Sequence, residues 1–504
     1  MYATDSWKAK PRLTVNYGLR WEPYLPQAMK VGAVLNFDEN RFHNGIKSTV
    51  YKNAPAGWYY PGDPSAPTGN LVANKRWAQL APRLGFAWDV NGDGKTSIRA
   101  SYGYSYNFVN AQWREDTVGS APWGNRTSLQ SVSLEDPWRD FPGGIPFPLI
   151  KGTDARFSAY SNMQSTSFNV KTPATSSWNL SLQRQIGSDW LLSATYIGTE
   201  TTHLWSQRQI NPAVYIPGSS TTANTNQRRR FNLERPADGQ LMAFVSDTDY
   251  GATQSYNGML LSVQRQAGRG VTFNANYTWS HCIGDYADVN SQGPAADETY
   301  SDPNNRRGDR GDCLGERRQS FNFTGLADSP KFSNPVLRTI VSGWRLSGIY
   351  TLASGIPFTV ITGSDRSLTA VGLGSANNQR VKQVLPNIYG DRSGRPLTNY
   401  LNSAAFELPV LGTVGNIGRN SVRGPKTWSF DMALSRSLPI RERQRVELRI
   451  EAFNVTNSFR PGNIATQGTS GSGAFLSLAS SNTFGQIRNA LSPRILQFAL
   501  KYVF

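Results

Sequence analysis

The sequence predicts an all-β fold of antiparallel strands, and three observations support this prediction. Apolar and polar residues alternate with a period of two in segment after segment, as they do in strands with one apolar and one polar face. The 504 residues include 46 Gly and 29 Pro, and 12% are aromatic, which is a composition of strands and turns. The connections between the alternating segments are short at one end and long at the other. An all-helical protein is therefore excluded.

The chain is basic, but its charge is sparse. Lys and Arg number 52 and Asp and Glu 35, for a net charge of +17, yet only 17% of residues are charged. Nucleic-acid-binding proteins are often this basic, but the strand pattern argues against that class, and we expect no nucleic-acid partner. The mean hydropathy of −0.46 would suit a soluble protein. Membrane-spanning barrels share such low values because every second strand residue faces a polar lumen.

The alternating segments follow one another along the whole chain. Residues 12–21 form the first complete one, and their length of about ten residues suits a tilted strand that crosses a bilayer. A partial strand precedes it, around Trp7. Together with these two, the remaining predicted segments bring the total to about 13 strands: 82–90, 98–106, 178–186, 190–196, 261–266, 271–279, 321–327, 344–352, 428–437, 445–454 and 494–504.

Short and long connections alternate between these strands. Long ones occupy residues 22–81, 107–176 and 354–427, whereas short turns follow four strand ends: Val90, Ile186, Gln266 and Leu438. Outer-membrane barrels have short periplasmic turns and long extracellular loops. The sequence therefore predicts an antiparallel transmembrane β-barrel in the outer membrane of a Gram-negative bacterium, with the membrane lipid as its surroundings.

Aromatic residues stand near the predicted strand ends, as the interfacial girdles of such a barrel require. The predicted girdle consists of Trp7, Trp21, Trp88, Trp190, Trp279, Trp344 and Trp428. Core packing between two sheets is the alternative reading of these residues. The last strand alternates up to a C-terminal phenylalanine and resembles the signal strand that the barrel-assembly machinery recognises. The residues of this signal are Leu496, Phe498, Leu500, Tyr502 and Phe504.

The remaining chemically distinctive residues suggest structure rather than catalysis. Cys282 and Cys313 are either idle thiols or, as their Gly/Asp/Arg-rich setting favours, a disulfide that closes a loop of about thirty residues. The three histidines are far apart and have no partner at metal-ligand spacing. The arginine run 228–230 either contacts lipopolysaccharide phosphates or is solvated, and we favour solvation. We expect no catalytic residues, no cofactor and no metal, and the substrate-binding residues stay unassigned.

Several phrases of the sequence resemble one known family. They include SWKAKPRLTVNYGLRWE, APRLGFAWDVNGDGKTSIRASYG, SWNLSLQRQIG, GNIGRNSVRGPKTWSFDMALSRSLPI and ELRIEAFNVTNSF. These phrases are similar to the C-terminal barrel of Oar-like TonB-dependent transporters. The resemblance implies that residues 1–504 are the C-terminal part of a barrel of about 22 strands. It also implies that the signal peptide, the plug and about nine strands are absent, so that TonB acts only through missing N-terminal parts.

Two other functions remain open at this stage. The chain could be a secreted soluble β protein that binds glycans through exposed Trp and Tyr side chains, in which case another sheet would cover the apolar strand face. It could also be a passive porin or adhesin, which would need no plug.

Overall fold

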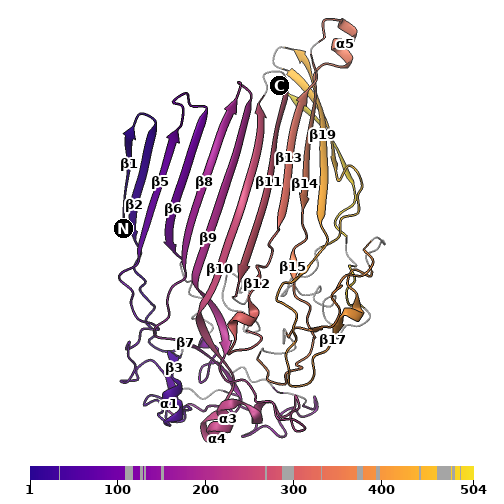
Figure 1. Cartoon of the computed structure of the whole chain (residues 1–504). Helices are drawn as coiled ribbons and strands as arrows, with labels where there is room; N and C mark the ends of the chain where they lie inside the picture. The colour runs from indigo at the N-terminus through magenta and orange to yellow at the C-terminus, as the bar shows by residue number, and fades with distance from the viewer. Residues whose placement is uncertain are drawn as a thin grey trace.

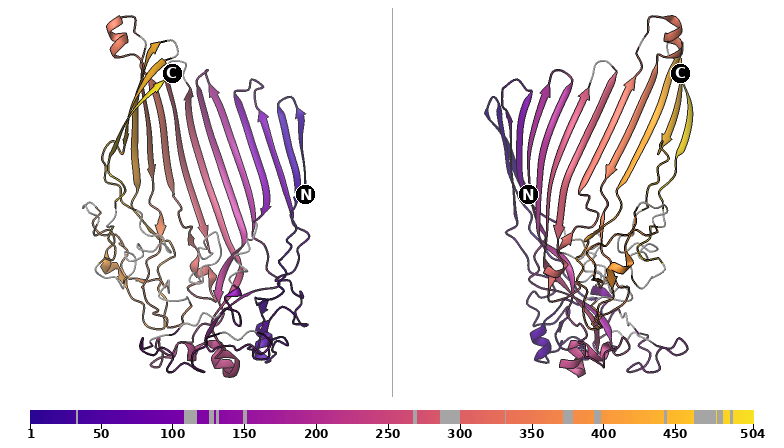
Figure 2. Two further views of the ribbon diagram at one scale, coloured as in Figure 1. Left: turned by 180° about the vertical axis from the view of Figure 1, so that it is seen from behind. Right: turned by 45° about the vertical axis from the view of Figure 1, so that its right-hand side comes forward.

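One large antiparallel sheet dominates the computed structural model of the chain (Figure 1). The structure describes residues 1–32, 34–107, 117–124, 129, 132–148, 152–266, 270–285, 300–330, 332–371, 379–392, 398–441, 444–462, 478, 483–487 and 490–504. Each strand of its main path pairs antiparallel with the next. Figure 2 shows that the sheet is curved and open, with β1 and β21 as its two edges.

The 13 strands of this path correspond one by one to the predicted segments, which confirms the predicted fold class. In order they are β1 (Tyr2–Lys10), β2 (Leu13–Trp21), β5 (Leu80–Asp89), β6 (Thr96–Tyr106), β8 (Ala174–Ile186), β9 (Trp190–Gln209), β10 (Met242–Gln266), β11 (Val271–Gly284), β13 (Gln319–Asp328), β14 (Trp344–Ala353), β19 (Thr427–Arg441), β20 (Gln444–Phe453) and β21 (Ile495–Val503).

The remaining elements are short and lie between these strands. The strands are β3 (Asn36–Phe37), β4 (Trp58–Tyr59), β7 (Ser161–Thr166), β12 (Gly311–Asp312), β15 (Pro357–Phe358), β16 (Lys382–Gln383), β17 (Phe406–Glu407) and β18 (Val422–Arg423). The helices are α1 (Glu39–His43), α3 (Arg230–Glu234), α4 (Pro236–Gly239) and α5 (Pro335–Ile340), with 3₁₀ turns η1 (Asn226–Arg228), η2 (Arg306–Asp309) and η3 (Ser403–Ala405). Among the described residues, no helix combines the length and the apolar character needed to cross a membrane.

The two ends of the sheet differ as predicted. At one end, which we name the short-turn rim, tight connections join β1 to β2, β5 to β6, β8 to β9 and β19 to β20. At the other end, the long-loop rim, the connections gather into a separate mass of chain (Figure 1). One connection departs from the pattern, because residues 329–343 lie at the short-turn rim and carry α5 (Figure 1).

The register of the strands keeps apolar and polar residues on opposite faces of the sheet. One row of directly paired residues runs through Val271, Ala327, Leu346, Leu434, Ile450 and Phe498. A row on the other face runs through Ser262, Asn276, Asn322, Thr351 and Ser429. We name these the apolar face and the polar face.

The apolar face is uncovered in the described part of the chain. Leu84 is 56% exposed, Leu180 52% and Leu500 75%, although side chains of this kind are normally buried in a soluble protein. The soluble alternative needed a second sheet over this face. The described residues contain no such sheet, so that alternative is wrong for this part of the molecule.

The buried core lies in the long connections instead. One cluster packs Phe42, Trp58, Tyr60 and Phe231 together, and a second cluster forms around Phe358, Val360 and Phe406. We call the described long connections the cap, because they fold against one another at the long-loop rim. β9 and β10 extend into the cap with 20 and 25 residues, and β7 pairs parallel with the far end of β10.

Candidate functional site

The seven girdle tryptophans all lie on the apolar face, at two levels. Trp88, Trp190 and Trp344 stand where their strands meet the short-turn rim. Trp21, Trp279 and Trp428 stand toward the long-loop rim, and Trp7 pairs with Val15 within the first hairpin. Two belts of rings on one face are the arrangement that two membrane interfaces require.

The C-terminal strand β21 forms one edge of the sheet. It pairs with β20 through Leu448 and Leu500 and has no described strand on its other side. The side chains predicted as the assembly signal are highly exposed: Leu496 53%, Phe498 70%, Leu500 75%, Tyr502 51% and Phe504 90%. The recognition of this strand by the assembly machinery stays a prediction.

A disulfide joins Cys282 at the end of β11 to Cys313, which follows β12. The two residues are 31 positions apart, and the amide of Cys313 also donates to the carbonyl of Cys282 at 3.1 Å. The disulfide therefore links the chain that follows β12 back to β11.

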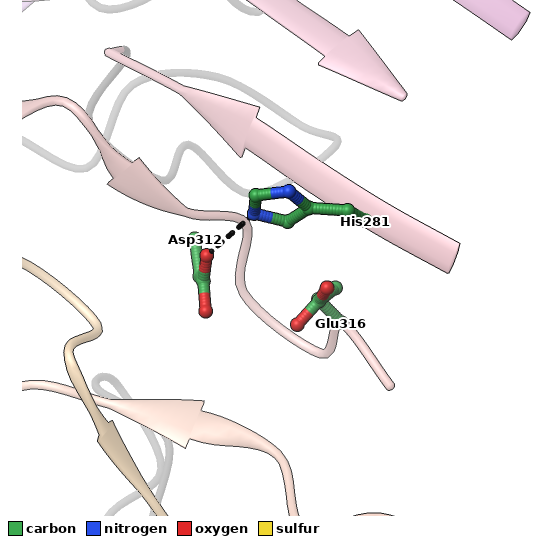
Figure 3. Close-up of side chains that lie close together, drawn as sticks. All are labelled: His281, Asp312 and Glu316. Atoms are coloured by element: carbon green, nitrogen blue, oxygen red, sulfur yellow. Dashed lines mark hydrogen bonds and ion pairs between the residues drawn. The ribbon is translucent and has the colours of Figure 1, made fainter. Parts of the chain in front are cut away.

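Next to this disulfide, a histidine and two carboxylates come together. Figure 3 shows His281 pointing from β11 toward Asp312, with Glu316 beside them. His281 Nε2 lies 3.0 Å from Asp312 Oδ1. One ligand atom from each residue lies within 4.8 Å of the others, which is close enough for a metal ion. The sequence search missed this group because His281 stands more than thirty positions before the two carboxylates.

Two arginines already engage these carboxylates, however. Arg423 contacts both Asp312 and Glu316, and Arg318 Nε lies 3.0 Å from Glu316 Oε1. Two guanidinium charges balance two carboxylate charges, so the group is satisfied as an ion-pair network. This network joins β11, the connection that follows β11, and β18 into one unit.

The cap contains an open, hydrophilic pocket of about 450 Å³. Its lining includes three carboxylates and four asparagine amides: Asp38, Glu39, Asp247, Asn36, Asn40, Asn74 and Asn169. Arg208 Nη2 lies 3.5 Å from Asp247 Oδ2, and burial raises the pKa of the Asp247 carboxyl to about 6. Such a lining suits a ligand with hydroxyl or cationic groups. At least five separate segments supply this lining, so no sequence motif could have revealed the pocket.

The polar face carries a second hollow, of about 700 Å³. It follows a row of small or polar paired residues, Ser6, Asn16, Gly85, Ser101 and Asn179. Asn179 Nδ2 donates to Ser101 Oγ at 2.6 Å, so part of this surface is already hydrogen-bonded.

The structure corrects the prediction for the arginine run. Arg228 and Arg229 are only 4% and 5% exposed, so they are neither solvated nor available to lipopolysaccharide. Arg228 donates to the carbonyl of Leu368 at 3.1 Å, and Arg229 donates to that of Asn211 at 2.9 Å. Burial lowers the pKa of Arg229 to about 10. Carbonyl groups of folded cap segments hold these side chains, which a basic run in the sequence does not indicate.

Several solved structures of outer-membrane proteins are similar to this chain. The outer membrane transporter YddB from Escherichia coli aligns at 9% identity and a TM-score of 0.46, over 98% of this chain and 43% of that one. The copper transporter OprC aligns at 9% identity and a TM-score of 0.41, over 100% and 48%. The pyoverdine receptor FpvA from Pseudomonas aeruginosa PAO1 aligns at 10% identity and a TM-score of 0.41, over 100% and 41%. The chain thus spans less than half the length of each of these proteins.

No curated protein matches the chain. A family model described as an outer membrane beta barrel domain matches residues 1–497. This match agrees with the exposed apolar face, the tryptophan belts and the unequal rims. The chain therefore belongs to the outer membrane beta barrel domain family and lies in the outer membrane of Gram-negative bacteria.

Proposed function

We propose that residues 1–504 form the C-terminal part of the barrel of an Oar-like TonB-dependent transporter. In this role the chain provides barrel wall and ligand-binding surface and carries out no catalysis. TonB acts through N-terminal parts that this chain does not contain, and the barrel-assembly machinery recognises β21.

The open sheet is the observation that carries this proposal. An antiparallel sheet of 13 strands cannot close with antiparallel pairs throughout, because its two edge strands run in the same direction, and β1 and β21 are not paired in the structure. The backbone groups of β1 and β21 would meet lipid unpaired, at several kcal/mol for each group. Additional strands from a larger barrel, of the size that TonB-dependent transporters have, satisfy both edges.

The two rims assign the sides of the membrane. Short turns of outer-membrane barrels face the periplasm and long loops face the outside, so the cap is extracellular and the polar face lines the lumen. A ligand arriving from outside meets the cap, which contains the pocket around Asp247. We propose that this pocket captures a hydrophilic ligand with hydroxyl or cationic groups before it passes into the lumen.

The test is to find the rest of the protein. The genomic DNA upstream of the codon for Met1 would be sequenced, and mass spectrometry of outer membranes would search for peptides that it encodes. The expected result is peptides of a plug and of about nine further strands, covalently continuous with this chain. An upstream frame with strands but without a plug would support a porin or adhesin instead. No upstream frame at all would overturn the proposal.

A further inference from the structure

The connection between β13 and β14, which carries α5, presents an apolar surface at the short-turn rim, where most turns are polar. None of the residues of α5 is buried. Val336 is 63% exposed, Leu337 44%, Ile340 60% and Val341 39%. Four exposed aliphatic side chains in one short segment mark a surface that binds something apolar.

Hydrogen bonds tie this segment to the end of the apolar face at the short-turn rim. The indole Nε1 of Trp344 donates to the carbonyl of Ile340 at 2.9 Å, and Arg436 donates to the carbonyl of Thr339. At its base, Ser329 and Trp344 exchange hydrogen bonds of 2.8 and 3.0 Å. The C-terminal end of α5 is therefore fixed beside the periplasmic tryptophan belt, and the helix stands beyond the ends of the neighbouring strands (Figure 2).

Arg436 places a positive charge beside α5 and Trp344. Its guanidinium lies 5.2 Å from the centre of the Trp344 ring, and its Nε has no hydrogen-bond partner. Among the described residues, no carboxylate forms an ion pair with it.

An apolar hollow of about 230 Å³ begins directly on the membrane side of Arg436. Gly325 and Gly348, which pair with each other, form its floor. Phe273, Phe323 and Phe430 are among the residues that line it. For comparison, an apolar cavity of about 150 Å³ holds a benzene molecule, so the hollow has room for a segment of an acyl chain.

We propose that this surface binds an anionic phospholipid of the inner leaflet of the outer membrane. Arg436 meets its phosphate, the hollow receives part of one acyl chain, and α5 lies in the interface beside it. A cation at headgroup depth above an apolar hollow is the complement of such a lipid. This proposal depends only on the membrane location of the chain. It is therefore independent of which substrate the barrel transports.

Lipid retention tests the charged part of the site. The full-length protein that contains this chain would be purified from phosphatidylglycerol and phosphatidylethanolamine nanodiscs, and its bound lipid would be counted by native mass spectrometry. Arg436→Gln should lower retained phosphatidylglycerol by about tenfold. Arg436→Lys keeps the charge and should retain most of the lipid.

Arg345→Gln is the matched control, because Arg345 is the neighbour of Trp344 on the polar face and pairs with Asp328 at 2.7 Å. It should leave lipid retention unchanged. Equal losses in the control and in Arg436→Gln would overturn the proposal, as would retention of phosphatidylethanolamine in preference to phosphatidylglycerol.

The position of α5 can be tested separately. Because the chain's two cysteines are joined to each other, Ile340→Cys introduces a single thiol for an environment-sensitive fluorophore. Nitroxide phospholipids should quench this probe strongly and aqueous iodide weakly. Strong iodide quenching would show that α5 stands in the periplasm, open to water or to a protein partner, and would refute its place in the interface.

Discussion

Gly198 shows how a single residue shapes the membrane-facing surface. It lies opposite Trp178 in the β8–β9 pair, and the indole ring covers it. A Cβ at this position would be 2.3 Å from Trp178 Cε2, well inside van der Waals contact. An aromatic ring over a glycine supports a strand that would otherwise lack packing there. The glycine is therefore required by close approach and not by its backbone angles.

Gly198→Ala should destabilise the barrel by about 1–3 kcal/mol, because the added methyl group must displace the ring. The measurement is the urea midpoint of the full-length protein in detergent, followed by the loss of heat-modifiable migration. Gly103→Ala is the matched control, since its nearest atom to an added Cβ is 4.0 Å away. Similar shifts in both variants would contradict the packing argument.

At the scale of elements, the end of β11 is fastened to the cap by two independent devices. The disulfide joins Cys282 to Cys313, and the ion-pair network joins the same connection to Arg423. The covalent link restricts the unfolded connection, whereas the network acts only in the folded state. Together they hold the mouth of the barrel near β11 and β12 in one arrangement.

Removing the disulfide should loosen this connection without unfolding the sheet. Cys282→Ser with Cys313→Ser should speed tryptic cleavage near Arg306 by up to several hundredfold, since such a bond contributes roughly 3–4 kcal/mol. Arg423→Gln is the companion variant that removes only the network. If the double serine variant is cleaved at the rate of the native protein, the ion-pair network alone is sufficient to hold this connection.

At the scale of the whole molecule, stability is divided between two environments. The cap has its own buried clusters and can exist in water, whereas the sheet exposes its apolar face and depends on lipid. The sheet also has two unpaired edges, which lipid cannot satisfy. We therefore expect that the chain by itself lacks a stable state in the membrane.

Cells that export only this chain should accumulate no closed barrel. The check is electrophoresis of their outer membranes with and without heating, because closed barrels migrate faster before heating. We expect aggregated or degraded chain in the fragment sample and a heat-modifiable band from the full-length gene. A heat-modifiable band from the fragment would mean that the edges find another partner.

Much of this fold could be predicted from the sequence, because a strand between lipid and lumen must alternate residue by residue. This alternation can be recognised within each segment, without knowledge of distant contacts. It therefore revealed the 13 strands, their two faces and the difference between the two rims. It could not reveal how far β9 and β10 extend, because strand residues in the aqueous cap need no alternation. The parallel pairing of β7 with β10 was likewise invisible.

The sequence by itself thus determined the membrane-spanning part and its orientation. The tertiary structure alone decided the cap and its sites: the burial of Arg228 and Arg229, the meeting of His281 with Asp312, and the pocket at Asp247. It also placed α5 beside Trp344. The physical reason is the range of the interactions, since contact with lipid imposes a pattern on each strand locally, whereas each cap site brings together residues from distant segments.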